Sequence, residues 1–100
     1  MIIIFIKIMV RPEKRKELSQ TLHSIVEQLS KESGCLHAGF YQDVGNENDL
    51  MVVEEWATQE DTNKYLGSDF FAVLLGAGSL MVRPPHIVIH TVSESTTLEV

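Results

Sequence analysis

Residues 2–10 read IIIFIKIMV, and this stretch decides the fold. Its β-branched and aromatic side chains occupy both the odd and the even positions, which is typical of a strand covered on both faces. The stretch is too short to span a bilayer, Lys7 interrupts it, and no signal-peptide cleavage pattern accompanies it. We therefore expect a central buried strand in a cytoplasmic protein without a membrane anchor.

A helix is expected directly after this strand. Pro12 suits the first turn of a helix, and Glu13 suits the positive end of its dipole. Gly34 is expected to end the helix in a left-handed conformation. Between these signals, apolar residues recur at helical spacing: Leu18, Leu22, Ile25, Val26 and Leu29.

The rest of the chain predicts three more strands and an interrupted second helix. Residues 35–44 and 50–56 form a hairpin around a turn at 45–49, and residues 86–92 form the last strand. Thr58 followed by Asp61 resembles a capping box that starts the second helix. That helix pauses at Gly67 and restarts after Ser68, and Pro84-Pro85 separates it from the last strand.

The order β-α-β-β-α-β is that of an α+β, ferredoxin-like fold with a four-stranded antiparallel sheet. Both helices of this fold normally cover one sheet face, yet the predicted strands are apolar on both faces. The surplus apolar face should therefore pack against the same face of a second copy, giving a homodimer. We expect one domain over residues 1–93, followed by a polar tail over residues 94–100.

Composition excludes several classes of function. The chain has 100 residues, 44% of them hydrophobic, and a formal net charge of −6, so nucleic acid and anionic membranes are not expected partners. Cys35 is the single cysteine, which rules out an intramolecular disulfide and a thiolate metal cage. His86 and His90 lie four apart on one strand, well over ~10 Å from each other, so a shared metal is not expected.

Several short motifs resemble those of the antibiotic biosynthesis monooxygenase family. Residues 32–36 (ESGCL) resemble its E-x-G-C-L segment, and residues 54–58 (EEWAT) resemble its E-x-W-x-[ST] segment. Residues 68–71 (SDFF) resemble the S-x-x-F that opens its last helix. Tyr41 and Asp43 fall where the family often has an aromatic residue and an acid.

This resemblance implies a dimeric α+β barrel and suggests a reaction. Some members oxidise anthrones or quinols with molecular oxygen and need no metal or prosthetic group, so no cofactor is expected. Members often have a histidine nine residues after the tryptophan, where this chain has Tyr65. The haem-degrading branch needs an asparagine on strand one, a tryptophan at position 65 and a histidine near Leu75. None is present, and haem degradation is set aside.

Cofactor-free oxygenation needs an apolar cavity, a base and donors that stabilise charge. The candidates for the catalytic roles are Lys7, Tyr65 and His90. The candidates for binding an aromatic substrate are Trp56, Glu54, Tyr41 and Phe71. Each has a structural alternative: Lys7 could extend to the sheet rim, His90 could face solvent, and the others could belong to the core or its edge.

We therefore predict a cofactor-independent monooxygenase acting on a small aromatic quinol or anthrone. Its cavity should lie between sheet and helices within each protomer, where Lys7, Trp56, Tyr65 and His90 would have to converge. One alternative is a non-catalytic or stress-related module that holds an aromatic ligand in the same cavity. Another is an isomerase or decarboxylase, in which a base acts without oxygen.

Overall fold

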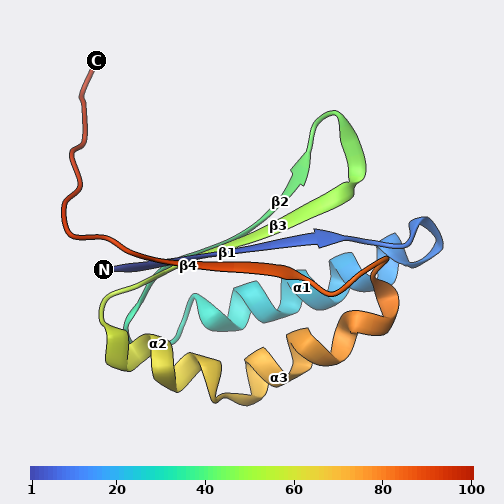
Figure 1. The fold of residues 1–100 in the computed structure, drawn as a ribbon, viewed down its shortest axis with the longest axis horizontal. Helices are drawn as coiled ribbons and strands as arrows, with labels where there is room; N and C mark the ends of the chain where they lie inside the picture. The colour runs from blue at the N-terminus through green and yellow to red at the C-terminus, as the bar shows by residue number, and fades with distance from the viewer.

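The structure is a computed structural model that describes residues 1–100. The predicted central strand is present as β1 (Ile2–Met9). It pairs antiparallel with β3 (Asn46–Trp56) on one side and with β4 (His86–Thr91) on the other. The fourth strand, β2 (Cys35–Asp43), pairs with β3, and the sheet order is β2-β3-β1-β4. The fold is therefore the predicted ferredoxin-like α+β arrangement (Figure 1).

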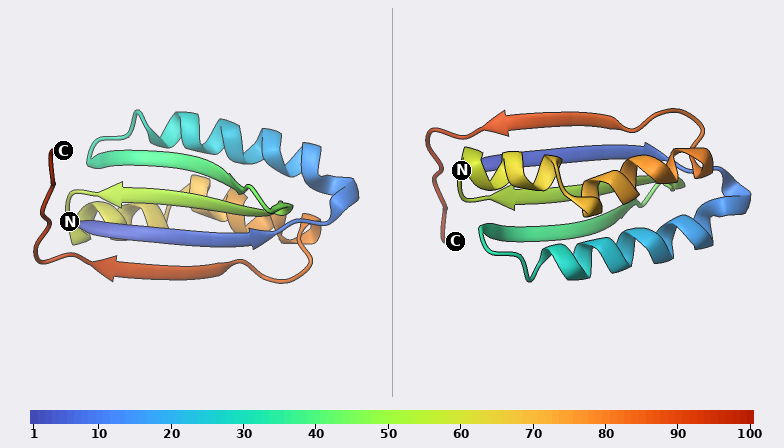
Figure 2. Two further views of the ribbon diagram at one scale, coloured as in Figure 1. Left: turned by 90° about the horizontal axis from the view of Figure 1, so that it is seen from above. Right: turned by 90° about the horizontal axis from the view of Figure 1, so that it is seen from below.

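All helices cover one face of this sheet, as Figures 1 and 2 show. They are α1 (Arg15–Leu29), α2 (Gln59–Leu66) and α3 (Asp69–Gly76), with short 3₁₀ turns at Pro12–Lys14 and Ala77–Leu80. The end of the β2–β3 hairpin bends away from the helices, and the C-terminal tail also rises on the helix-free side (Figure 1). No helix has the length and apolar character that crossing a membrane requires.

Alternation along β1 defines the two faces of the sheet. Ile2, Ile4, Ile6 and Ile8 are buried against the helices, whereas Lys7 is exposed and its odd-numbered neighbours are half-buried. The expectation that β1 is covered on both faces therefore holds for only one face of a single chain. We call the other, helix-free face the open face.

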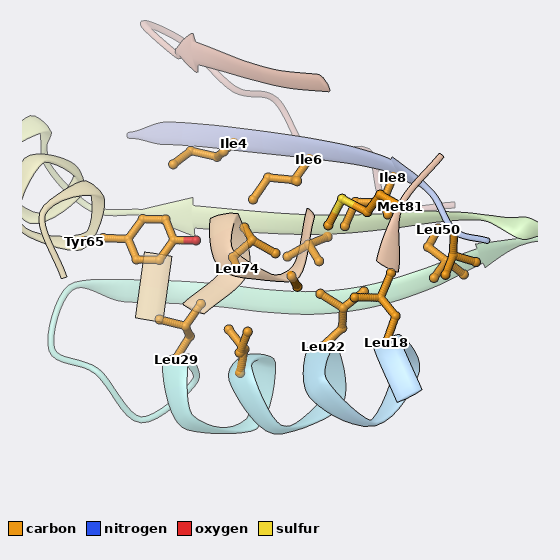
Figure 3. Packing of buried hydrophobic residues seen from close by; sticks show 14 of the residues in the cluster. Ile4, Ile6, Ile8, Leu18, Leu22, Leu29, Leu50, Tyr65, Leu74 and Met81 are labelled. Atoms are coloured by element: carbon orange, nitrogen blue, oxygen red, sulfur yellow. The ribbon is translucent and has the colours of Figure 1, made fainter. Parts of the chain in front are cut away.

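The core lies between the sheet and the helices. Leu18, Leu22 and Leu29 on α1 are fully buried, as the helical spacing predicts, and they meet Ile4 and Ile6 on β1 (Figure 3). Each such side chain removed from water contributes about 1.5–3 kcal/mol to folding. Leu74 completes this layer from α3.

Two predicted boundaries are wrong. The first helix ends at Leu29 rather than at Gly34, because three residues of turn follow Ser30 before the chain reverses. Gly34 does adopt the left-handed conformation, with φ of 88°, but it does so at the entry to β2. The hairpin turn is shorter than residues 45–49, because a side-chain oxygen of Asp43 accepts from the Gly45 amide and closes it.

The helix starts agree with the sequence patterns. The Thr58 hydroxyl accepts from the Asp61 amide at 3.1 Å and caps α2. The helix stops at Gly67, and the Ser68 hydroxyl accepts from the Phe71 amide to cap α3. The same Ser68 hydroxyl donates to the Tyr65 carbonyl at 2.6 Å, so the break between the helices is fixed by hydrogen bonds.

Candidate functional site

A carboxylate is buried between the sheet and the helices. Glu54 lies on β3 with the parity that points toward the helices, and its side chain is fully buried. Its Oε1 accepts from Trp56 Nε1 at 3.0 Å, and its Oε2 accepts from the Tyr65 hydroxyl at 2.7 Å. No ion pair involves Glu54, so two neutral donors alone stabilise its charge.

Trp56 and Tyr65 form one aromatic unit around this carboxylate. Their rings stack with centroids 5.0 Å apart and an interplanar angle of 23°. The rings of Phe71 and Tyr65 form a T-shaped pair with centroids 5.5 Å apart and an interplanar angle of 67°. Trp56 and Tyr65 are both buried, and Tyr65 points from α2 into the core (Figure 3). Three of the predicted substrate-binding residues and one predicted catalytic residue are thus brought together.

Burial perturbs both acids of this unit. Loss of water raises the pKa of Glu54, and its hydrogen bonds from Tyr65 and Trp56 oppose that rise. The pKa of Tyr65 is raised by burial, by the Glu54 charge and by the hydrogen bond it donates to Glu54. A buried carboxyl with a raised pKa is the type of group that serves as a general base near neutral pH.

A cavity of about 240 Å³ lies beside the aromatic unit. Trp56 and Tyr65 form one part of its wall, and Phe70 forms another. The last turn after α1 and the first turns of α2 supply the polar rim: Glu32, Ser33, Asp61 and Lys64. Glu54 is not part of the lining, so it communicates with the cavity only through Trp56 and Tyr65.

The other predicted site residues lie on the open face. Lys7, His90 and Tyr41 have the opposite strand parity from Glu54 and Trp56, and all three are exposed. The His90 ring contacts Phe5, and the Tyr41 hydroxyl bonds to His37 at 3.0 Å. The predicted convergence of Lys7, Trp56, Tyr65 and His90 on one cavity does not occur within the chain.

A second hollow, of about 630 Å³, lies on the open face where the hairpin bends. Lys7, Tyr41, Arg83 and His86 contribute to its lining, together with Asp43 and Asp49. It faces away from the buried carboxylate. No group of three or more histidine, cysteine or carboxylate side chains gathers anywhere at a spacing suited to a metal ion.

Sequence reasoning missed Phe70 and Lys64 as cavity residues. Both lie on the helices that follow the E-x-W segment, and Lys64 directly precedes Tyr65. After the break at Gly67, Phe70 packs against the core beside α1 and also lines the cavity. One signal could have found Lys64. Asp61 lies three residues before Lys64 and four before Tyr65, and residues three or four apart are neighbours on one helix face.

The fold and the site define a class: a ferredoxin-like α+β protein with an aromatic cavity and a buried carboxylate between sheet and helices. A model of the antibiotic biosynthesis monooxygenase family matches residues 1–74, and the chain belongs to that family. The predicted resemblance is therefore confirmed at the level of the family.

Relatives of known sequence agree with this assignment. YcnE of Bacillus subtilis, whose name marks it as a candidate monooxygenase, is 26% identical over 91 residues, covering 91% of this chain and 96% of YcnE. An uncharacterised protein of Synechocystis, sll1783, is 25% identical over 92 residues. The match covers 91% of this chain but only 63% of the Synechocystis protein.

Solved structures share the fold. A protein of Deinococcus radiodurans, described as a candidate antibiotic biosynthesis monooxygenase, superposes with a TM-score of 0.89 at 18% identity, covering 99% of both chains. A conserved protein of Methanosarcina mazei superposes with a TM-score of 0.83 at 29% identity, covering 89% of both chains.

Proposed function

We propose that this protein is a cofactor-independent monooxygenase that acts on a small aromatic quinol or anthrone-like molecule. The observation that carries the proposal is the buried Glu54 carboxylate, joined to an aromatic cavity through Trp56 and Tyr65. Membership of the antibiotic biosynthesis monooxygenase family supports the reaction class. Lys7, His90 and Tyr41 are left out of this site because they lie on the open face.

The proposed role of Glu54 is that of a base acting through Tyr65. A substrate hydroxyl at the Tyr65 oxygen passes its proton to that oxygen, while the Tyr65 hydroxyl passes its own proton to Glu54 Oε2 at 2.7 Å. The electron-rich substrate anion then reacts with dioxygen. For a quinol, one oxygen atom becomes a ring hydroxyl of the hydroxyquinone product and the other leaves as water. For a methylene carbon of anthrone type, one oxygen atom forms the product carbonyl and the other leaves as water.

Cavity size restricts the substrate. At about 240 Å³ the cavity is smaller than the roughly 300–1,000 Å³ typical of sites for drug-sized ligands. A small aromatic molecule, a quinol of one or two rings or an anthrone of three, is therefore the size of substrate that we propose.

Oxygen consumption with menadiol tests the proposal. The wild type should consume oxygen above the buffer rate, and Tyr65→Phe should lower kcat on the order of 10²-fold, because the relay loses its hydroxyl. Tyr41→Phe removes the same atom from the open face and should retain activity. A wild type without activity across a panel of quinols argues against this function.

One observation favours a second candidate, a binding module for aromatic ligands. Tyr65 is only 3% exposed and Glu54 is fully buried, which suits a stable pocket wall as well as a base. Binding alone would raise the melting temperature without consuming the ligand. Turnover that persists without oxygen would instead indicate an isomerase or decarboxylase.

We also propose that the protein is a homodimer whose open faces pack together. Half-buried Phe5, Val53 and Val88 lie side by side on that face, where no helix covers them. Covering apolar surface of this kind stabilises association. Sedimentation should show a dimer at micromolar concentration. The free thiol of Cys35 suits the cytoplasm, which we retain as the proposed location.

A further inference from the structure

The mouth of the aromatic cavity carries charged side chains. Three charged residues line the cavity of about 240 Å³, and they are Glu32, Asp61 and Lys64. Glu32 lies on the turn between α1 and β2, whereas Asp61 and Lys64 lie three residues apart on α2. Residues at this spacing are neighbours on one helix face. A largely aromatic cavity thus ends in a charged rim that two separate segments of the chain supply.

Two other polar groups of the lining are already engaged in helix caps. The Asp61 carboxylate accepts from the Thr58 hydroxyl at 2.8 Å and lies against Gly34. The Ser68 hydroxyl donates to one backbone carbonyl and accepts from one backbone amide. These bonds reduce the capacity of both groups to bind a ligand.

Glu32 and Lys64 have no such partners. No ion pair involves either residue, although the two carry opposite charges and line the same cavity. Neither side chain makes a hydrogen bond within the chain, and the Ser33 hydroxyl beside them makes none either. A ligand that reaches the mouth of the cavity therefore meets one free cation and one free anion.

The chemistry of these two groups selects one kind of substituent. An ammonium group only donates hydrogen bonds, and a carboxylate only accepts them. A carboxylate on the ligand would be attracted by Lys64 but repelled by Glu32, and an amine would meet the reverse. A hydroxyl suits both, because its oxygen accepts from the ammonium group while its proton is donated to the carboxylate.

We infer that Glu32 and Lys64, here called the rim pair, bind a second hydroxyl of the aromatic substrate. This inference rests on the proposed function, in which the first hydroxyl lies at the Tyr65 oxygen. Tyr65 is buried and points into the core (Figure 3), whereas both members of the rim pair are exposed. The two hydroxyls therefore belong at opposite ends of the ring system. The rim pair determines specificity for such diols against aromatic acids, amines and ethers.

Binding measured in the absence of oxygen tests this inference. The ligands are hydroquinone, its monomethyl ether and para-hydroxybenzoate, titrated calorimetrically under argon so that affinity does not depend on any reaction. The wild type should bind hydroquinone on the order of fivefold more tightly than the ether, which has no second proton to donate. Para-hydroxybenzoate should bind more weakly still, because Glu32 repels its carboxylate.

Substitution of each member of the rim pair should change this order in its own way. Glu32→Ala should weaken hydroquinone binding on the order of fivefold, leave the ether within about twofold and strengthen binding of para-hydroxybenzoate. Lys64→Met should weaken hydroquinone to a similar extent and para-hydroxybenzoate further. Both residues are exposed, so both variants should keep the melting temperature of the wild type.

Two controls separate the rim pair from general charge effects. Glu60→Ala and Lys31→Met change the net charge exactly as the rim variants do, at exposed positions that do not line the cavity. Both should leave all three affinities unchanged. Losses in these controls as large as those in the rim variants would show a general charge effect and overturn the inference.

The outcomes distinguish this inference from the proposed reaction. A wild type that binds the three ligands equally well, or binds none of them, overturns the role of the rim pair even if it consumes oxygen with menadiol. A preference for hydroquinone that both rim variants lose supports that role. If the same protein consumes no oxygen with any quinol, only the proposed oxygenase reaction fails.

Discussion

The Tyr65 hydroxyl donates its only proton to Glu54 Oε2 at 2.7 Å, and no ion pair involves this carboxylate. The bond joins α2 to the C-terminal end of β3 across the core. In the proposed reaction the same oxygen would accept the substrate proton. One contact thus has both a structural and a chemical consequence.

Removal of the Tyr65 hydroxyl should destabilise the protein. Tyr65→Phe leaves Glu54 Oε2 buried without a donor, which costs about 1–3 kcal/mol in the free energy of unfolding. Tyr41→Phe is the matched control, because its hydroxyl is exposed and bonds only to His37. Urea unfolding of both variants measures the difference. Equal losses would show that the buried bond contributes no more than the exposed one.

Stability should depend on pH through Glu54. Its folded pKa is raised above the ordinary value of 4.5, so between the two values the folded state binds more protons than the unfolded state. This contribution is present below about pH 4.5 and is lost as the pH rises through the folded pKa. Glu54→Gln, which does not titrate, should gain stability relative to the wild type over that window. Urea unfolding at a series of pH values measures the free energy of unfolding of both proteins. If the difference between wild type and Glu54→Gln does not change with pH, the pKa of Glu54 is not raised.

Tyr65 should resist ionisation for as long as the protein is folded. Burial and the neighbouring Glu54 raise its pKa, so the tyrosinate absorbance of Tyr41→Phe should stay flat in alkali until unfolding begins. The sign of the linkage makes the folded state less stable above the ordinary tyrosine pKa of about 10. If Tyr65 ionises while the circular dichroism spectrum still shows a folded protein, the hydroxyl is not buried as the structure has it.

Gly34 should tolerate no side chain. Its φ is 88°, and a Cβ there would collide with the Asp61 carboxyl group. We expect Gly34→Ala to lower the free energy of unfolding by about 2 kcal/mol or more, from backbone strain and this collision. Gly78→Ala is the control, since a Cβ added at Gly78 would meet no other atom within 4 Å. Similar effects of the two substitutions would exclude the proposed collision.

The fold was predictable because local signals agreed with one another. The Thr58 cap, the break at Gly67 and the spacing of leucines on α1 each had a direct physical cause in neighbouring residues. Glu54 and Trp56 could be placed on one face because strand parity requires it. Tyr65 entered only through the family resemblance, since nothing in its local sequence pairs it with Glu54.

The division of the candidate site could not be predicted. Strand β1 has apolar residues at both its even and its odd positions, so its sequence does not show which set of side chains faces the helices. Lys7 and His90 were therefore grouped with Trp56, although the register sets them on the other face. The early end of α1 at Leu29 was equally hidden, because Gly34 is left-handed in either case.

The placement of every helix on one side of the sheet has a consequence for kinetics. In a dimer joined through the open faces, each 240 Å³ cavity would look outward, with two sheets between it and its twin. A ligand bound in one cavity would then touch no residue of the other cavity and would leave its affinity unchanged. Ligand saturation should therefore be hyperbolic, with a Hill coefficient of about one.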